Sequence, residues 1–478
     1  MSSNMRRRKI QKSPDYSDDN SSDDNQSDDT ILCPACSAEL PMGKHHDSIN
    51  LHSMVSKPGT SSGNPTTTHH RSKLFNWRCC CCTLISLIVL IAGIAVVSGI
   101  FAYLRWENDR KERLATHEHL QRIVEQINNS PHVRWKAKFN PFGVRVKDYD
   151  HHSLKNITAI KQYFGHIEAF FRSPVMEQHL RELEEFPTQS LPRTFDAREK
   201  WSHCPSLHHV PNQGGCGSCY ATASMGVASD RSCIHSNGTY RSELSVQDVL
   251  GCCQACGNCY GGDPIKALTF WALEGVVTGG HDGCRPYAVH SDCGTPCRPD
   301  EYSRAEASRT CEKQCQAGYY KNTYEKDKNF GSIAYTLYPR KMSLDQAGKE
   351  RVMLPSIIGY FNSTALATIG RNLTVQETRD IIQKELLLYG PTTLALPLTE
   401  EFLHYDSGIF HPVPDSNLEK RIIYWHVVRL IGWGHDDHDK LYWIAINSFG
   451  SEWGENGLFR VDPSLLERFG LEYETGLL

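Results

Sequence analysis

Cys219 is the residue whose type and setting are best suited to covalent chemistry. It lies in the run QGGCGSCYA, where small residues lead into an alanine- and serine-rich stretch that predicts a buried helix beginning near this cysteine. A helix N-terminus stabilises the thiolate, which is the nucleophilic form of cysteine, so we expect a lowered thiol pKa. The alternative is that Cys219 is half of a disulfide bond, because the surrounding region is rich in cysteine.

A nucleophilic thiol needs a base, and the base needs a residue that orients its ring. His426 lies in the strand-like run IIYWHVVRLIGWG, and Asn447 lies in the strand-like run LYWIAINSFGSEWG. If these strands pair across the polar turn HDDHDK, the Asn447 side-chain oxygen can accept from the imidazole. Gln213 lies six residues before Cys219, where its amide could donate to a developing oxyanion together with the Cys219 backbone N–H.

The cysteines are distributed unevenly along the 478 residues. Thirteen of the nineteen fall between Cys204 and Cys315, which indicates an oxidising compartment for this part of the chain. Because thirteen is an odd number, we expect at least one free thiol there. The net charge of −4 argues against nucleic acid as a partner.

Residues 83–104 carry no charge and lie between Arg78 and Arg105. Such a segment is long enough to cross the ~30 Å hydrocarbon core of a bilayer as a helix. The flanking positive charges do not decide its orientation. Together with the cysteines, the glycosylation sequons that follow the segment predict a single-pass type II protein with a cytosolic N-terminus. The five sequons are at Asn128, Asn156, Asn237, Asn362 and Asn372.

The segments on either side of this helix differ in composition. Residues 1–82 hold an acidic repeat and no apolar periodicity, which predicts a disordered cytosolic tail. Cys33 and Cys36 in this tail have the spacing of half a zinc site, but the second cysteine pair is missing. Residues 105–190 contain a charged helical stretch and no cysteine, and we expect a stalk or a segment that packs on the cysteine-rich domain.

The runs QGGCGSCYA, WHVVRLIGWG and INSFGSEWGENG resemble, in order and in local context, the motifs of papain-like cysteine peptidases. The flanking runs LPRTFDAREKW, SDRSCIHSNG, CYGGDP and CQAGYYKNTYEKDKNFG resemble cathepsin B. The resemblance covers about residues 190–478, with a fainter match of residues 110–190 to the inhibitory propeptide. It implies an α+β fold with a helical lobe, a β-barrel-like lobe and an active cleft between them. We therefore expect residues 105–190 to be a stalk and propeptide-like segment and residues 191–478 to be the peptidase domain.

The resemblance also implies a role for each motif residue. Cys219 is expected to be the nucleophile, His426 the general base and acid, Asn447 the orienting residue and Gln213 the oxyanion donor. The implied activity is hydrolysis of protein or peptide substrates through a thioester acyl-enzyme, in an endolysosomal or extracellular compartment. We expect a monomer with no cofactor and no metal.

Further residues are assigned by the same resemblance. Substrate binding is expected at Gly261 and Gly262 in CYGGDP and at Glu474 in GLEYETG, which corresponds to the acid that accepts arginine in the second specificity pocket of cathepsin B. The implied disulfides use every cysteine of the cluster except Cys219. The pairs are Cys204 with Cys233, Cys216 with Cys259, Cys252 with Cys311, Cys253 with Cys256, Cys284 with Cys315, and Cys293 with Cys297.

Several positions depart from the family pattern. Tyr220 follows the nucleophile in place of tryptophan, and Phe449 replaces a tryptophan that shields the histidine–asparagine hydrogen bond. Tyr424 and Trp425 stand where small residues usually precede the base, and we expect these two rings to narrow the cleft. This departure keeps open an alternative function, a weakly active or inactive peptidase-like binding protein on the membrane.

Two segments differ in length from their counterparts in the family. The segment CRPYAVHSDCGTPC lacks the histidine pair with which cathepsin B captures a substrate's C-terminal carboxylate, and His290 is its single histidine. We therefore expect endopeptidase rather than exopeptidase activity. Residues 338–373 have no counterpart, and we interpret them as a glycosylated surface insertion.

Overall fold

The computed structural model describes residues 77–145, 174–294, 296–298, 301–316, 320–335, 337, 373–413 and 417–476. Several predictions fall outside the described residues. These are the tail up to residue 76, Cys33 and Cys36, the sequons at Asn156, Asn362 and Asn372, and the insertion at 338–373 apart from Leu373.

Helix α1 (Trp77–Asn129) is a single helix of 53 residues. Its part Leu84–Asn129 contains a window of mean hydropathy 2.8 whose side chains are not buried in the protein, so it is long and apolar enough to cross a membrane. The sequence predicted a separate membrane span and a separate charged helix. The structure joins them, because no proline or glycine lies between residues 100 and 129 to interrupt the helix. Thr116, Leu120 and Ile127 near its C-terminal end are buried.

The helical lobe is organised around α5 (Cys219–His235), which is buried along most of its length. Its alanines, serines and Gly226 let neighbouring elements approach closely, and it packs against α7 and the long strand β7. Helix α7 begins at Pro264, with the Asp263 side chain accepting from the Ile265 N–H as an N-cap. The other helices of this lobe are α4 (Ala197–Lys200), α6 (Val246–Cys252), α7 (Pro264–Glu274), α8 (Tyr302–Ala307) and α9 (Tyr324–Asp327).

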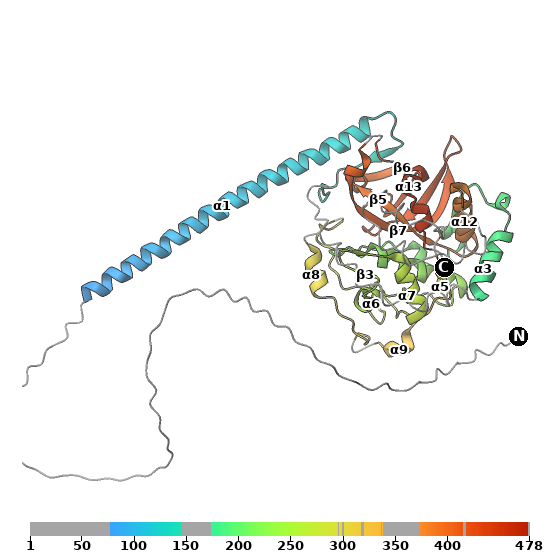
Figure 1. Cartoon of the computed structure of the whole chain (residues 1–478), viewed down its shortest axis with the longest axis horizontal. Coiled ribbons are helices and arrows are strands. Elements are labelled where there is room, and N and C mark those ends of the chain that lie inside the picture. The colour runs from blue at the N-terminus through green and yellow to red at the C-terminus, as the bar shows by residue number, and fades with distance from the viewer. Residues whose placement is uncertain are drawn as a thin grey trace, which may run out of the picture. The chain divides into compact units, whose positions relative to one another are not determined.

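The second lobe is built on a seven-stranded sheet with the order β1-β6-β9-β8-β7-β2, in which β5 also pairs with β7. Strand β7 lies at its centre, antiparallel to both β5 and β8. Figure 1 shows this sheet lobe beside the helices α5, α6 and α7. The strands are β1 (Trp135–Ala137), β2 (Phe195–Asp196), β5 (Thr392–Thr399), β6 (Tyr405–Phe410), β7 (Ile422–His435), β8 (Leu441–Ile446) and β9 (Leu458–Val461).

Shorter elements complete the arrangement. A separate two-stranded ribbon is formed by β3 (Gly257–Asn258) and β4 (Gly261–Gly262). The remaining helices are α3 (Pro174–Glu185), α12 (Val375–Leu388) and α13 (Pro463–Phe469), with 3-10 turns η3 (Thr188–Ser190), η4 (Pro205–His208), η6 (Phe402–His404), η7 (Leu418–Arg421) and η8 (Leu471–Glu474). The predicted α+β fold with a helical lobe and a sheet lobe is confirmed.

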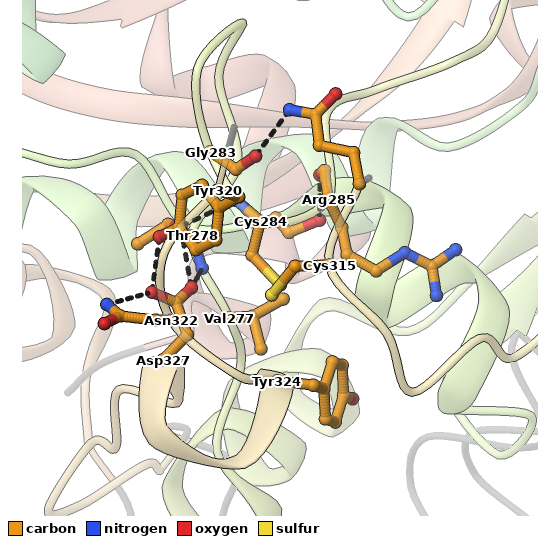
Figure 2. Close-up of a disulfide and its surroundings, with 12 residues drawn as sticks. Val277, Thr278, Gly283, Cys284, Arg285, Cys315, Tyr320, Asn322, Tyr324 and Asp327 are labelled. Atoms are coloured by element: carbon orange, nitrogen blue, oxygen red, sulfur yellow. Dashed lines mark hydrogen bonds between the residues drawn. A yellow bond between two sulfur atoms is a disulfide. The ribbon is translucent and has the colours of Figure 1, made fainter. Parts of the chain in front are cut away.

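Six disulfide bonds join the pairs that the resemblance implies, and Cys219 is the cysteine left free in the cluster from Cys204 to Cys315. Figure 2 shows the surroundings of the Cys284–Cys315 bond. Asp327 accepts there from the Thr278 backbone N–H (2.8 Å) and from the hydroxyl groups of Thr278 and Tyr320. These hydrogen bonds lower the pKa of Asp327 against the opposing effect of burial. A buried carboxylate and a disulfide therefore hold this long connection together.

A buried ion pair joins the two lobes. The Arg429 guanidinium of β7 donates to both carboxylate oxygens of Asp230 in α5, at 3.1 and 3.0 Å. It also donates to the backbone carbonyl groups of Ser206 (3.0 Å) and His209 (2.6 Å). Asp230 is fully buried, and Arg429 is 5% exposed. The guanidinium thus links α5, the 3-10 turn before it and the central strand.

We expect Arg429→Met to be strongly destabilising, because it leaves the Asp230 carboxylate buried without its partner. The expected loss is about 3–5 kcal/mol of unfolding free energy, measured by urea denaturation of the full chain followed by tryptophan fluorescence. The matched control is the double substitution Asp230→Asn with Arg429→Met, which removes both charges and should recover a large part of the loss. A single variant as stable as the native chain would contradict the importance of this pair.

Candidate active site

Cys219 is the first residue of α5, as the sequence predicted, and its side chain is 6% exposed. Ser218, the residue before it, shares a hydrogen bond of 2.8 Å with the Tyr287 hydroxyl. Burial raises the pKa of the Cys219 thiol to about 11, while backbone N–H groups of Val427, Tyr220 and Cys219 itself act to lower it. The expectation of a lowered thiol pKa is therefore wrong for this structure. The helix terminus acts in the expected direction, but the desolvation caused by the packed second lobe is larger.

His426 and Asn447 are brought together by the pairing of β7 with β8. The register places Arg429 of β7 opposite Ile446, the last residue of β8, so Asn447 follows directly at the strand end. His426 Nε2 lies 2.8 Å from Asn447 Oδ1, which confirms the predicted side-by-side arrangement of these residues. His426 Nδ1 is buried and has no hydrogen-bond partner among the described residues, so it is the ring nitrogen left for proton transfer.

The base lies on the same strand that covers the thiol. A hydrogen bond from the Val427 backbone N–H lowers the pKa of the Cys219 thiol, and Val427 directly follows His426 in β7. His426 is fully buried. Burial lowers its pKa to about 4, and the hydrogen bond that the ring donates to Asn447 Oδ1 opposes this effect. Burial therefore disfavours the charged form of each group taken singly.

Aromatic rings surround the imidazole. Phe449 stacks on the His426 ring at a centroid distance of 4.9 Å, and Trp453 packs edge-on against Phe449. Phe449 is 1% exposed, a position from which it can keep water from the hydrogen bond between His426 and Asn447. Tyr424 lies edge-on to the imidazole at 6.2 Å.

The two aromatic residues before the base differ in orientation. Side chains alternate along a strand, so Tyr424 lies on the His426 face of β7 and Trp425 on the opposite face. There Trp425 packs edge-on against Phe469 of α13 at 5.2 Å. The two rings therefore lie on opposite faces of β7, and Tyr424 is the one on the face of the base.

Gln213 is held by groups on both sides of the site. Its Oε1 accepts from the Ser448 hydroxyl at 2.6 Å, and its Nε2 donates to the Cys216 carbonyl at 3.0 Å. Its backbone carbonyl accepts from the Tyr287 hydroxyl at 2.7 Å. The amide nitrogen therefore points into the loop that carries Cys219, with a second hydrogen left to donate. Sequence reasoning missed Ser448 and Tyr287, although Ser448 directly follows Asn447.

The predicted substrate-binding residues lie in two separate elements, the short strand β4 and the 3-10 turn η8. Gly261 and Gly262 form β4, and a side chain on Gly262 would lie 2.6 Å from the Tyr220 ring. Glu474 ends the 3-10 turn η8, but its side chain is outside the described residues. The nearby Glu472 is buried and accepts from the guanidinium of Arg379 at 2.9 Å.

The short loop closed by Cys293 and Cys297 lies against the loop that precedes the nucleophile. The His290 carbonyl accepts from the Gly215 N–H at 3.0 Å, whereas the His290 side chain is exposed. A cavity of about 730 Å³ adjoins this loop and is bordered by Gly215, His290 and Arg285. None of the four predicted catalytic residues lines it, so it is separate from the candidate active site.

Two sequons lie within the described residues. Asn237 is exposed in the turn after α5 with a left-handed backbone (φ 50°). Asn128 is also exposed, but its side-chain nitrogen donates to the Ala137 carbonyl at 2.8 Å.

The chain matches known proteins over most of its length. A profile of the family described as "Papain family cysteine protease" matches residues 191–351 and 310–474. The "Cathepsin B-like cysteine proteinase" of Schistosoma japonicum is 33% identical over 356 residues, which are 71% of this chain and 84% of that protein. The "Cathepsin B-like cysteine proteinase 6" of Caenorhabditis elegans is 33% identical over 300 residues, which are 60% of this chain and 65% of that protein.

Solved structures of precursor proteases are also similar. The structure titled "proCathepsin B S9 from Trypanosoma congolense" has 20% sequence identity and a TM-score of 0.47, and the match covers 74% of this chain and 95% of that chain. Because the family profile spans more than half of this chain and the schistosome protein aligns with most of it, the chain belongs to the papain family of cysteine proteases, with cathepsin B-like relatives.

Proposed function

We propose that this chain is a membrane-anchored, cathepsin B-like cysteine endopeptidase that is made as an inactive precursor. The observation that carries the proposal is the free Cys219 thiol at the start of α5, beside the strand that holds His426 with its Asn447 partner at 2.8 Å. A free cysteine in a domain with six disulfide bonds needs a reason to remain unpaired, and nucleophilic catalysis supplies one.

The reaction follows from the positions of these groups. The Cys219 proton passes to His426 Nδ1, and the sulfur attacks the substrate carbonyl carbon. Asn447 holds Nε2 and stabilises the imidazolium, while the Gln213 amide and the Cys219 N–H donate to the oxyanion. His426 then protonates the leaving amine as the C–N bond breaks, which forms the thioester. A water molecule, deprotonated by His426, attacks the thioester, and the thiol departs with the acid product.

The directions of the two pKa shifts are compatible with this mechanism. Burial disfavours an isolated thiolate at Cys219 and an isolated imidazolium at His426. Transfer of the proton within the pair creates both charges together, so that each stabilises the other. The aromatic surroundings of His426 strengthen this attraction because they exclude water.

Contacts of residues 105–190 with the rest of the chain support the precursor proposal. Strand β1 adds to the sheet by antiparallel pairing with β6. Arg134 pairs with Asp436 and Asp462, which come from two different loops of the sheet lobe. Helix α3 packs on α12, where His179 contacts the buried Glu385. Cleavage near Leu191 would leave this segment held by such noncovalent contacts, and we refer to it as the pro-segment.

The membrane anchor and its orientation are part of the same proposal. Helix α1 supplies a segment long and apolar enough to span a bilayer. The disulfide bonds and the exposed sequon at Asn237 favour a lumenal or extracellular position for the peptidase domain, in an endolysosomal compartment or outside the cell. A cytosolic N-terminus and a type II orientation follow.

The alternative is a peptidase-like binding protein with little or no activity. The observation that favours it is the position of Tyr424, whose ring lies on the His426 face of β7. The opposing observation is that Gln213, His426 and Asn447 keep their hydrogen-bonded arrangement.

Covalent labelling tests the proposed nucleophile. After cleavage near Leu191, an epoxide inhibitor of thiol peptidases should form one adduct on Cys219, seen by mass spectrometry of the intact chain. The Cys219→Ser chain, processed by the same added protease, is the control and should remain unmodified. A processed native chain that forms no adduct would favour the binding alternative.

Replacing Tyr424 tests whether its ring restricts the cleft. We expect Tyr424→Gly to raise kcat/KM for peptide substrates severalfold, mainly through a lower KM, because room is gained beside the base. Trp425→Gly is the matched control on the opposite face. It should give no gain in activity and should cost about 2 kcal/mol of stability through lost packing against Phe469. Equal activity gains in both variants would contradict this assignment.

A panel of synthetic peptides tests the substrate preference. We expect cleavage at internal bonds, in peptides with blocked and free C-termini alike, with arginine favoured two residues before the cleaved bond. Product masses identify the cleavage sites. Glu474→Ala should weaken the arginine preference and leave the internal cleavage pattern unchanged. Release of C-terminal dipeptides from free-ended peptides alone would overturn the endopeptidase assignment.

A further inference from the structure

His404 lies in η6 of the sheet lobe and is covered by the pro-segment. The side chain is 1% exposed. Its Nδ1 accepts from the Asn140 backbone N–H at 2.9 Å, and the Phe139 ring stacks on the imidazole at a centroid distance of 5.8 Å. The His404 backbone is held as well, since the Lys138 N–H donates to its carbonyl at 2.8 Å. The histidine is therefore part of the surface on which residues 138–143 dock.

The second ring nitrogen of His404, Nε2, faces residue 143 of the pro-segment. His404 Nε2 is buried and makes no hydrogen bond among the described residues. Gly143 lies against this edge, where an added Cβ would be 3.1 Å from Nε2 and 3.0 Å from Leu120. Because Nδ1 accepts a hydrogen bond from a backbone amide, it carries no proton. The docked ring is thus neutral, with its proton on Nε2.

We propose that His404 is an acid-sensitive lock on the pro-segment: its neutral imidazole holds residues 138–143, and its protonation releases them. The inference rests on the proposed precursor function and states how the inhibited form opens. A proton on Nδ1 removes the acceptor of the Asn140 N–H. It also places a positive charge in a buried site without a hydrogen-bonding group to receive it, and such a charge is costly.

The charged and titratable neighbours of His404 do not relieve this cost. His119 of α1 is bonded to Glu400 at 2.8 Å, and Glu401 is paired with Arg421. His119 repels a charge on His404 and so lowers the His404 pKa, together with the larger effect of burial. Two further groups face the same region. These are His117, whose ring contacts Phe139 at 4.5 Å, and the exposed side chain of Lys138.

The other histidine contacts of the pro-segment differ from that of His404 because each has a carboxylate beside it. His119 contacts Glu400 at 2.8 Å, and His179 of α3 contacts the buried Glu385. His404 has no carboxylate bonded to its ring among the described residues. We expect the pro-segment to open at its β1 end first.

The difference between the pKa of docked His404 and that of released His404 sets how the docking constant depends on pH. Burial lowers the pKa of docked His404 to about 4, against an ordinary value of about 6.5 for a histidine exposed after release. The docking contribution is complete above the released pKa and is lost as the pH falls through the interval between the two values. Between about pH 7.5 and about pH 5 the docking constant should fall about 30-fold.

Hydrogen exchange of the full chain in detergent micelles tests the lock. The chain carries Cys219→Ser so that it cannot cleave itself, and exchange rates are corrected for the intrinsic effect of pH. Protection of the Lys138 and Asn140 amides should fall about 30-fold between about pH 7.5 and about pH 5, while α3 and α5 remain protected. A constant level of protection over this interval would overturn the proposal.

Two further variants separate titration from packing. His404→Gln keeps an oxygen that can accept from the Asn140 N–H but does not titrate, so protection should change less than about threefold over the same interval. Gly143→Ala crowds the ring and should lower protection equally at every pH, with the acid dependence retained. The lock is refuted if the glutamine variant loses protection as steeply as the native ring, or if the alanine variant has lost its acid dependence.

This experiment is independent of catalysis. A chain that releases residues 138–143 in acid but forms no epoxide adduct after processing would contradict the proposed peptidase and leave the lock intact. A chain that forms the adduct but shows no acid-dependent exchange would contradict the lock alone.

Discussion

The proposed catalytic arrangement depends on one constraint, the packing of α5 against β7 through the buried Asp230–Arg429 pair. Asp230 lies eleven residues after Cys219, which is close to three helical turns, so both residues lie on the same side of α5. Gly226 lies between them, where an added Cβ would approach Arg429 at 3.2 Å. A guanidinium bound to Asp230 and to two backbone carbonyl groups therefore sets the rotation of the helix and the position of the thiol beside the histidine strand.

Two sets of buried titratable groups differ in what surrounds them. Each of four buried carboxylates has an arginine partner, and these pairs are Asp230 with Arg429, Glu385 with Arg231, Glu401 with Arg421, and Glu472 with Arg379. Cys219, His426 and His404 have no arginine partner, and burial shifts the pKa of each toward its neutral form. The four carboxylates that hold the fold together are thus each paired with an arginine in the folded chain. The groups assigned to proton transfer and to release of the pro-segment have no arginine partner, so we expect them to become charged when their surroundings change.

Local sequence patterns predicted what is decided locally. The small-residue turn predicted a helix start at Cys219, and two strand-like runs joined by a polar turn predicted the contact of His426 with Asn447. The thiol pKa, the opposite face of Trp425 and the burial of His404 were not predictable in this way. Each depends on a partner distant in the chain: the second lobe covers Cys219, Phe469 receives Trp425, and Asn140 bonds to His404. Burial by partners that are distant in the chain leaves no periodic pattern in the sequence around the buried residue.

The continuity of α1 connects anchoring with inhibition. Thr116, the first buried residue after the apolar segment, lies twelve positions after Leu104, which corresponds to about 18 Å of uninterrupted helix. The proposed anchor is thus continuous with the pro-segment and is not part of the peptidase domain. Under the proposed function, once the chain is cleaved near Leu191, the contacts that cover His404 and those of α3 would hold the domain to the membrane as well as block it. Under the proposed mechanism, loss of those contacts frees the peptidase from inhibition and from its anchor in the same step.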